Sequence, residues 1–128
     1  MTAEIAALDN ALERAGEDVV LRRFAGKAPN QVSVDVTVRA SVRAVSAEQI
    51  IVGTISQTGL NIVISPSQIM AAQWPGGLRD GAVLSSADPR IPRATDKIVV
   101  QGKERQIKVS RPIFVGGTWV RCDLVADG

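Results

Sequence analysis

The residues that could carry chemistry are few, and their types exclude the commonest catalytic sites. The 128-residue chain has no histidine and a single cysteine, Cys122. Ser–His and Cys–His pairs and imidazole metal sites therefore cannot form within it. Cys122 alternates with Val120 and Leu124 on one face of a β-type stretch, which is typical of a buried and unreactive thiol. One cysteine also allows neither an internal disulfide nor a cysteine metal cluster.

The acidic and glycine-rich positions add no clear motif. Neither Gly76-Gly77 nor Gly116-Gly117 is followed by the Lys-Ser/Thr pair that opens the helix of a phosphate loop. A glycosidase-type pair of carboxylates stays open as a minor alternative. We predict a protein that is not an enzyme and has no cofactor and no metal site. The carboxylates that no motif assigns are Asp88, Asp96, Glu104 and Asp123.

Charge and hydropathy limit the possible partners. Lys and Arg number 15 against 13 for Asp and Glu, so the net charge is +2. The basic residues are spread along the chain, whereas duplex-binding domains concentrate them on one face. No apolar stretch approaches the roughly 20 residues that span a bilayer, and the first residues lack the pattern of a secretion signal. We expect a soluble protein of a reducing cytoplasm that does not enter a membrane.

Residues 73–95 form a long stretch without periodicity, interrupted repeatedly by glycine and proline. Connections of this length in a compact domain are either functional or disordered. The stretch contains Arg79, Arg90 and Arg93. One reading is a disordered surface loop. The other is a loop that becomes ordered in an assembly, where the three arginines face a partner or DNA phosphates without reading bases.

Trp74 stands where this stretch begins and is one of two tryptophans in the chain. It has two readings. It can be a lid that covers the end of the protein's core. Alternatively, it can anchor a contact with a neighbouring subunit, because tryptophan is favoured at the centres of interfaces.

The element that organises the chain is the stretch from Val32 to Ala44. Its even positions are all valine or alanine and its odd positions are polar or charged. Period 2 over 13 residues predicts a long strand with one covered face, as found in antiparallel sheets and small barrels. Before it, we expect a helix over 2–15, capped by Thr2 and ended by Gly16, and a strand over 18–24.

Further β-rich runs separated by turn residues follow, so the pattern predicts seven or eight strands in total. A short helix begins at Ser65-Pro66, with Gln68 placed to complete a capping box, and ends by Ala72. The expected fold is mainly β: a small antiparallel β-barrel or sandwich with a short N-terminal helix, one short inserted helix and a long loop. We expect a single domain over 1–128, with helix 1–16, barrel 17–72 and 96–128, and loop 73–95. The later runs are 50–56, 60–65, 96–101, 105–110, 113–115 and 118–126.

The order of these features resembles the head-completion, or stopper, proteins at the neck of long-tailed bacteriophages, prophages and gene transfer agents. The likeness spans nearly the whole chain, and the order of elements carries it more than any motif. The segments that carry it are Gly16–Arg23 after the first helix, Val38–Arg43, Ile62–Ser65, Trp74-Pro75, Asp96–Val100 with the Gly102 turn, and Gly116–Leu124.

The resemblance implies a structural role in the virion neck, with assembly in the host cytoplasm. Such proteins form a homo-oligomeric ring, here of six or twelve subunits, in which opposite sides of each subunit must match. The ring lies between portal or adaptor proteins above and tail-terminator or tail proteins below. Packaged double-stranded DNA passes through it without sequence recognition. Residues 73–95 would occupy the place of the loop that retains DNA, and they would either plug the channel or grip a neighbour.

Two other function classes remain as alternatives. The first is a small β-barrel that binds nucleic acid, which would need exposed aromatic side chains for base stacking. The chain has only two Trp, two Phe and no Tyr, so a stacking platform is disfavoured. The second is an enzyme, disfavoured by the missing histidine. If residues 77–93 form only a loop, their deletion should leave the barrel folded.

Overall fold

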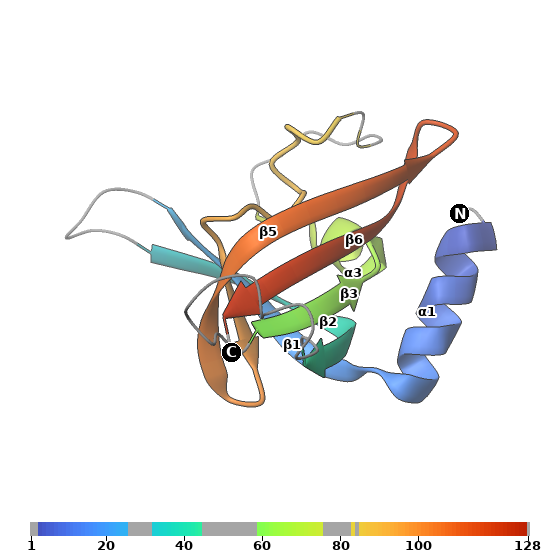
Figure 1. Ribbon diagram of the computed structural model, residues 1–128. Coiled ribbons are helices and arrows are strands. Elements are labelled where there is room, and N and C mark those ends of the chain that lie inside the picture. Colours follow the sequence, from blue (N-terminus) through green and yellow to red (C-terminus); the bar gives the residue numbers. More distant parts are fainter. Residues whose placement is uncertain (1–2, 26–31, 45–58, 76–82, 84, 128) are drawn as a thin grey trace, which may run out of the picture.

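A computed structural model describes residues 3–25, 32–44, 59–75, 83 and 85–127 of the chain. The predicted strand 50–56 lies outside these residues. Two helices and six strands are present in the described part (Figure 1). Along the chain they are α1 (Ala3–Ala15), β1 (Glu17–Ala25), β2 (Val32–Ala44), β3 (Gly59–Ile64), α3 (Ser67–Ala72), β4 (Lys97–Val100), β5 (Lys103–Val115) and β6 (Thr118–Asp127).

The six strands close into one antiparallel barrel with the order β1-β2-β3-β6-β5-β4. This confirms the mainly β fold with a short N-terminal helix and one short inserted helix. The predicted strand count was too high within the described part. The runs 105–110 and 113–115 belong to one continuous strand, β5, although Pro112 lies between them. Proline is tolerated there because that part of β5 has a strand partner on one side only.

Strand β2 has the predicted bounds and the predicted two faces. Val36, Val38 and Ala40 point inward and are buried, with Val38 opposite Val19 of β1. The alternation ends at the tips of the strand, where Val32 is 61% exposed. The tips are exposed because β2 extends past both neighbouring strands. β1 pairs only with residues 32–40 of β2, and β3 pairs only with residues 40–44.

Two hairpins therefore extend beyond the barrel. The β1–β2 arm consists of residues 23–25 and 32–34, which pair with each other and with no other described strand. The β5–β6 arm consists of residues 113–115 and 118–121, which are likewise paired only with each other among the described strands. The second arm turns at Gly116 and Gly117, whose φ angles are 59° and 80°, as predicted for a two-residue turn. The two arms point to opposite sides of the barrel (Figure 1).

Helix α1 packs outside the barrel against β2 and β6. Leu12 is its buried residue, and the Arg39 side chain of β2 donates to the carbonyl oxygens of Leu12 and Glu13 at 3.0 and 3.3 Å. The Leu12 carbonyl also accepts the N–H of Gly16 at 2.8 Å, whereas at Glu13 Arg39 bonds one of the carbonyls that a helix leaves open at its C-terminus. Gly16 follows directly, and a Cβ there would lie 2.7 Å from the carbonyl oxygen of Ala40. The close approach of two backbones therefore requires glycine at this position.

Helix α3 begins one residue later than the sequence predicts, because Pro66 and not Ser65 is its N-cap. The Ser65 hydroxyl accepts the backbone N–H of Ser67 at 3.2 Å, and the Met70 N–H bonds to the Pro66 carbonyl at 2.9 Å. The capping box is incomplete, because the buried side-chain oxygen of Gln68 has no hydrogen-bond partner. Ser67 instead donates its hydroxyl to Asp9 of α1 at 2.6 Å, which joins the two helices.

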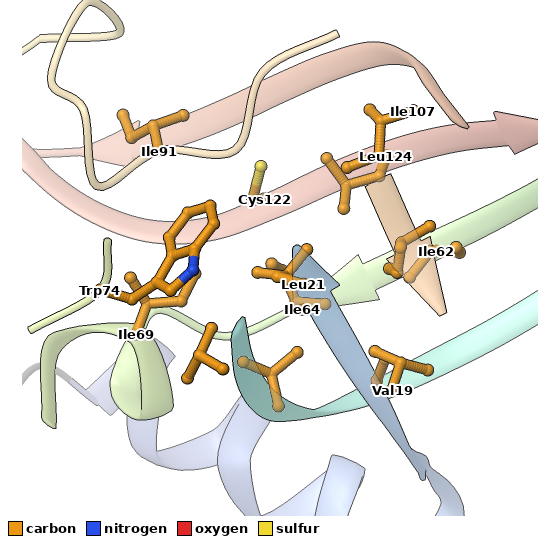
Figure 2. Packing of buried hydrophobic residues seen from close by; sticks show 14 of the residues in the cluster. Val19, Leu21, Ile62, Ile64, Ile69, Trp74, Ile91, Ile107, Cys122 and Leu124 are labelled. Atoms are coloured by element: carbon orange, nitrogen blue, oxygen red, sulfur yellow. The ribbon is translucent and has the colours of Figure 1, made fainter. Parts of the chain in front are cut away.

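The core fills the barrel from end to end (Figure 2). Leu21, Ile64 and Leu124 are each at most 1% exposed and lie in its middle. Trp74 lies at one end of the cluster, beside Ile69 and Ile91. Ile69 comes from α3 and Ile91 from the irregular stretch between α3 and β4, so this end is closed by residues outside the sheet.

Candidate functional site

The irregular stretch 73–95 carries every site residue that the sequence singled out. It begins where α3 ends, at Gln73, which adopts the left-handed conformation with φ 53°. The backbone N–H groups of Gln73 and Trp74 bond back to the carbonyls of Met70 and Ile69 at 3.2 and 3.1 Å. This helix end reverses the chain direction and turns the Trp74 side chain toward the barrel interior.

Trp74 is 2% exposed and belongs to the core of the monomer. Its indole Nε1–H donates to the carbonyl oxygen of Val34 at 2.9 Å, on the edge of β2 that β3 leaves unpaired. Of the two readings of this residue, the structure supports the lid. A side chain this deeply buried has no surface left for a neighbouring subunit, so Trp74 is not placed as an interface anchor.

Arg23 of β1 makes the central polar contacts beneath Trp74. Its Nε and Nη2 donate to the two carboxylate oxygens of Asp96 at 2.9 and 2.7 Å, a bidentate ion pair. The same guanidinium donates to the carbonyl oxygens of Pro89 and Ile91, and its Cζ lies 4.5 Å from the Trp74 ring centroid. Arg23 therefore ties β1 to both ends of the irregular stretch.

Asp96 is the acidic partner at this point and is 3% exposed. Besides Arg23, its carboxylate accepts the backbone N–H of Arg93 at 2.8 Å. Its carbonyl oxygen accepts the N–H of Ile107 at 3.0 Å, so the chain just before β4 lies along β5. A buried carboxylate with this many donors is a structural group, because its charge and lone pairs are already compensated.

Arg90 is buried as well, contrary to the expectation that it faces a channel. Its side chain is 6% exposed and forms a bidentate pair with Asp88, with N–O distances of 3.0 and 2.8 Å. The backbone N–H of Arg90 also donates to Asp88 at 2.9 Å. Arg93 is exposed, and Arg79 lies outside the described residues. The structure therefore separates Arg90 from Arg93 and turns them in different directions.

The described part of the stretch is irregular, as predicted, but it contributes to the core. Val83 and Ile91 are 4% and 2% exposed and pack with the barrel residues. The prediction that deletion of residues 77–93 leaves the barrel folded considers only lost strands and omits these two core residues. The deletion removes apolar core residues and leaves Arg23 without the carbonyls of Pro89 and Ile91.

The described residues include no activated catalytic group at this end of the barrel. Cys122 is buried, and loss of hydration raises the pKa of its thiol from 9.0 to about 11, which keeps it protonated and unreactive. This agrees with the prediction of an inert thiol. No three His, Cys, Asp or Glu side chains among the described residues could hold a metal ion. No helix in that part of the chain is long and apolar enough to cross a membrane.

Sequence reasoning missed Arg23 and Asp96 as a pair. One signal was available: in the strand starting at Glu17, alternation places Arg23 on the same face as Val19 and Leu21, which is the inward face. A charge at an inward position needs a buried partner. The identity of that partner was not predictable, because it lies 73 residues further along the chain.

Comparisons with known proteins do not identify the chain. No protein-family model matches it, and no curated protein matches it.

Proposed function

We propose that this chain is a structural subunit of a virion neck, a head-completion or stopper protein. It assembles as a homo-oligomeric ring between the portal and adaptor proteins of the head and the proteins of the tail. It retains packaged DNA and provides the surface on which the tail attaches. The resemblance in the order of elements suggests this function, and the arrangement of the two arms supports it.

The supporting observation is that the subunit has two different projections on opposite sides. A cyclic ring is built from heterologous contacts, in which one surface of each subunit meets a different surface of the next. The β1–β2 arm and the β5–β6 arm supply two such surfaces, pointing away from each other (Figure 1). Both arms have open strand edges, which in a monomer are a liability for aggregation and in a ring can be covered.

In this proposal, only the exposed residues of the irregular stretch contribute to DNA retention. Arg90 is paired inside the protein, so it serves stability in this proposal. Arg93 is exposed and Arg79 remains a candidate by sequence alone. In the ring these two arginines face the channel, where they contact phosphates of double-stranded DNA without sequence preference.

The alternative of a nucleic-acid-binding barrel gains no support from the aromatic residues. Trp74 and Trp119 are 2% and 4% exposed, so neither offers a face on which a base could stack. Phe24 is exposed, but a single phenylalanine does not make a stacking platform. We therefore retain the neck protein as the proposed function.

The decisive experiment removes the gene from a strain that produces the particles and examines the products by negative-stain electron microscopy. Loss of the subunit should yield separate heads and tails, and the heads should have lost DNA. Complementation with Arg93→Ala should restore joining but lower the fraction of DNA-filled heads. Normal, joined and filled particles in the absence of the protein would overturn the proposal.

A further inference from the structure

Phe24 is an aromatic side chain exposed to water near the end of the β1–β2 arm. It is 43% exposed and lies opposite Ser33, on the outer face of the hairpin. A single exposed hydrophobic residue is common on protein surfaces and needs no explanation by itself. Phe24 differs in its position, because it is carried beyond the barrel on a two-stranded projection.

An apolar groove of about 290 Å³ lies near the tip of the other arm. Ile5 of α1, Pro66 and Met70 at α3, Val83 and Trp119 line it. The indole N–H of Trp119 is already bonded to the carbonyl oxygen of Arg121 at 2.9 Å, and because the residue is only 4% exposed it adds a small apolar area to the groove. Segments far apart in the sequence thus build one apolar concavity.

The groove and the arm that carries Phe24 are on opposite sides of the subunit. The groove lies among α1, α3 and the start of β6, whereas the β1–β2 arm leaves the barrel on the far side from α1 (Figure 1). Phe24 therefore cannot reach the groove of its own chain. A second copy of the chain presents the missing side chain in the right place for a head-to-tail contact.

The groove is large enough for an aromatic side chain. An apolar cavity of about 150 Å³ in another protein is sufficient to bind benzene, and the groove exceeds that volume. Aromatic side chains that enter apolar pockets at the centre of an interface are also the residues that dominate association.

We propose that Phe24 of one subunit inserts into the groove formed by Ile5, Met70 and Trp119 of the next subunit. The contact is heterologous, so each copy offers one arm and one groove, and repetition of the contact generates the ring. The inference rests on the proposed function for its ring and specifies the residues that hold the ring together. Val115, which is 46% exposed on the β5–β6 arm, lies opposite Thr118 at the rim of the groove and extends the same contact.

Cysteine cross-linking with a short bis-maleimide tests the contact, because the native thiol of Cys122 is fully buried and gives little background. Two single variants, Ser33→Cys and Thr118→Cys, place one new thiol on the arm beside Phe24, which stays in place, and one at the groove rim. A mixture of the two should form cross-linked heterodimers. Ser33→Cys alone should give none, because heterologous contacts keep equivalent arms apart. A mixture of Val109→Cys and Thr118→Cys is the matched control and should not cross-link.

The same chemistry applied to assembled particles separates the inference from the proposed function. The variant with both new cysteines should give a ladder of cross-linked multimers ending at the closed ring. Particles that contain the protein but give no ladder would overturn the contact and leave the neck function standing. If purified wild-type particles do not contain the protein, the neck function is overturned. Homodimers of Ser33→Cys alone would show a twofold contact and also overturn the inference.

A third variant measures how much the phenyl group of Phe24 contributes to association between subunits. Phe24→Ser should fold normally, because the side chain is exposed, and its melting temperature as an isolated subunit should be unchanged. Its association should weaken by about thirtyfold, the effect expected for a central aromatic anchor. The control Val109→Ser removes another exposed hydrophobic side chain and should leave association unchanged. Equal association of Phe24→Ser and wild type would contradict the proposal.

Discussion

The middle of the barrel and its end at Trp74 are both buried, but they are stabilised by different chemistry. In the middle, Leu21, Ile64 and Leu124 meet with apolar atoms only. At the Trp74 end, the bidentate pair of Arg23 and Asp96 lies beneath the indole ring. The strands alone close the middle, whereas the end needs an irregular stretch of chain to cover it.

The difference follows from backbone hydrogen bonding. Strands in the closed barrel satisfy one another's N–H and C=O groups, so their side chains can be wholly apolar. In its described part, the irregular stretch bonds its backbone only in short turns, such as the Ile91 N–H to the Asp88 carbonyl at 3.0 Å, and the carbonyls of Pro89 and Ile91 accept hydrogen bonds from Arg23. A buried arginine is therefore the consequence of using a loop as a lid, and a buried carboxylate is in turn needed to balance its charge.

The largest expected effect comes from breaking the apolar middle with a charge. Val38→Asp places a carboxylate on the covered face of β2, where Val38 is 1% exposed and faces other apolar side chains. An unpaired buried charge is too costly for a small domain, so we expect the variant to be unfolded at neutral pH. Circular dichroism and thermal melting measure this. A cooperative transition like that of the wild type would mean that the faces of β2 are wrongly assigned.

The next largest effect comes from removing one charge at the Trp74 end. Asp96→Asn keeps the shape of the side chain but leaves the Arg23 guanidinium buried without a counter-charge. We expect a loss of about 3–5 kcal/mol in the free energy of unfolding. Urea denaturation measures it. Asp18→Asn is the control, because Asp18 pairs with Arg39 while 70% exposed, and its change should be small.

The double variant Arg23→Met with Asp96→Leu sharpens the comparison. It replaces the buried ion pair beneath Trp74 with apolar side chains, so neither partner is left as an unpaired buried charge. We expect it to recover part of the stability that Asp96→Asn loses, with the remaining deficit arising from the carbonyls of Pro89 and Ile91. A double variant less stable than the single variant would show that this end depends on the ion pair itself.

The thiol of Cys122 gives the middle of the barrel a pH dependence. Its folded-state pKa is raised to about 11 by burial, above the 9.0 of an ordinary thiol. The folded protein therefore holds this proton more tightly than the unfolded chain, and stability is lost as pH rises from about 9 to 11. Comparison with Cys122→Ala should isolate roughly 2 kcal/mol of this loss. Parallel pH profiles for both proteins would contradict the assignment.

A smaller effect is expected from the hydrogen bond that holds Trp74. Trp74→Phe retains most of the ring but removes the Nε1–H that bonds to the Val34 carbonyl oxygen. Leaving this buried acceptor unsatisfied should lower the free energy of unfolding by about 1–3 kcal/mol. Chemical denaturation measures it. An unchanged midpoint would show that Val34 finds another donor.

The smallest effect is expected on the outer face. Arg121 and Asp123 form an ion pair at 2.6 Å on β6, and their side chains are 45% and 31% exposed. Arg121→Ala should change the free energy of unfolding by about 0–1 kcal/mol, because water and salt screen the pair. The change should shrink further in high salt. A loss as large as that of Asp96→Asn would remove the distinction between exposed and buried pairs.

The elements of the barrel were predictable because their signals are local. The alternation of Val32–Ala44 gave the bounds of β2, and Gly116-Gly117 gave the tight turn of the β5–β6 hairpin. The closing of the end by Ile91 and Asp96 was not predictable from local pattern. It depends on contacts between β1 and a stretch more than 60 residues later, which has no periodicity of its own. The groove likewise depends on tertiary packing of α1, α3 and β6.

Gly16 fixes where helix α1 meets β2. A Cβ there would lie 2.7 Å from the Ala40 carbonyl oxygen, so a larger residue would have to displace the helix. Ile5 lies eleven residues away, about 16 Å along the helix axis, so a tilt of about 5° at Gly16 would move it by roughly 1.4 Å. A substitution at Gly16 would therefore shift Ile5, which lines the apolar groove, from a position remote from the groove itself.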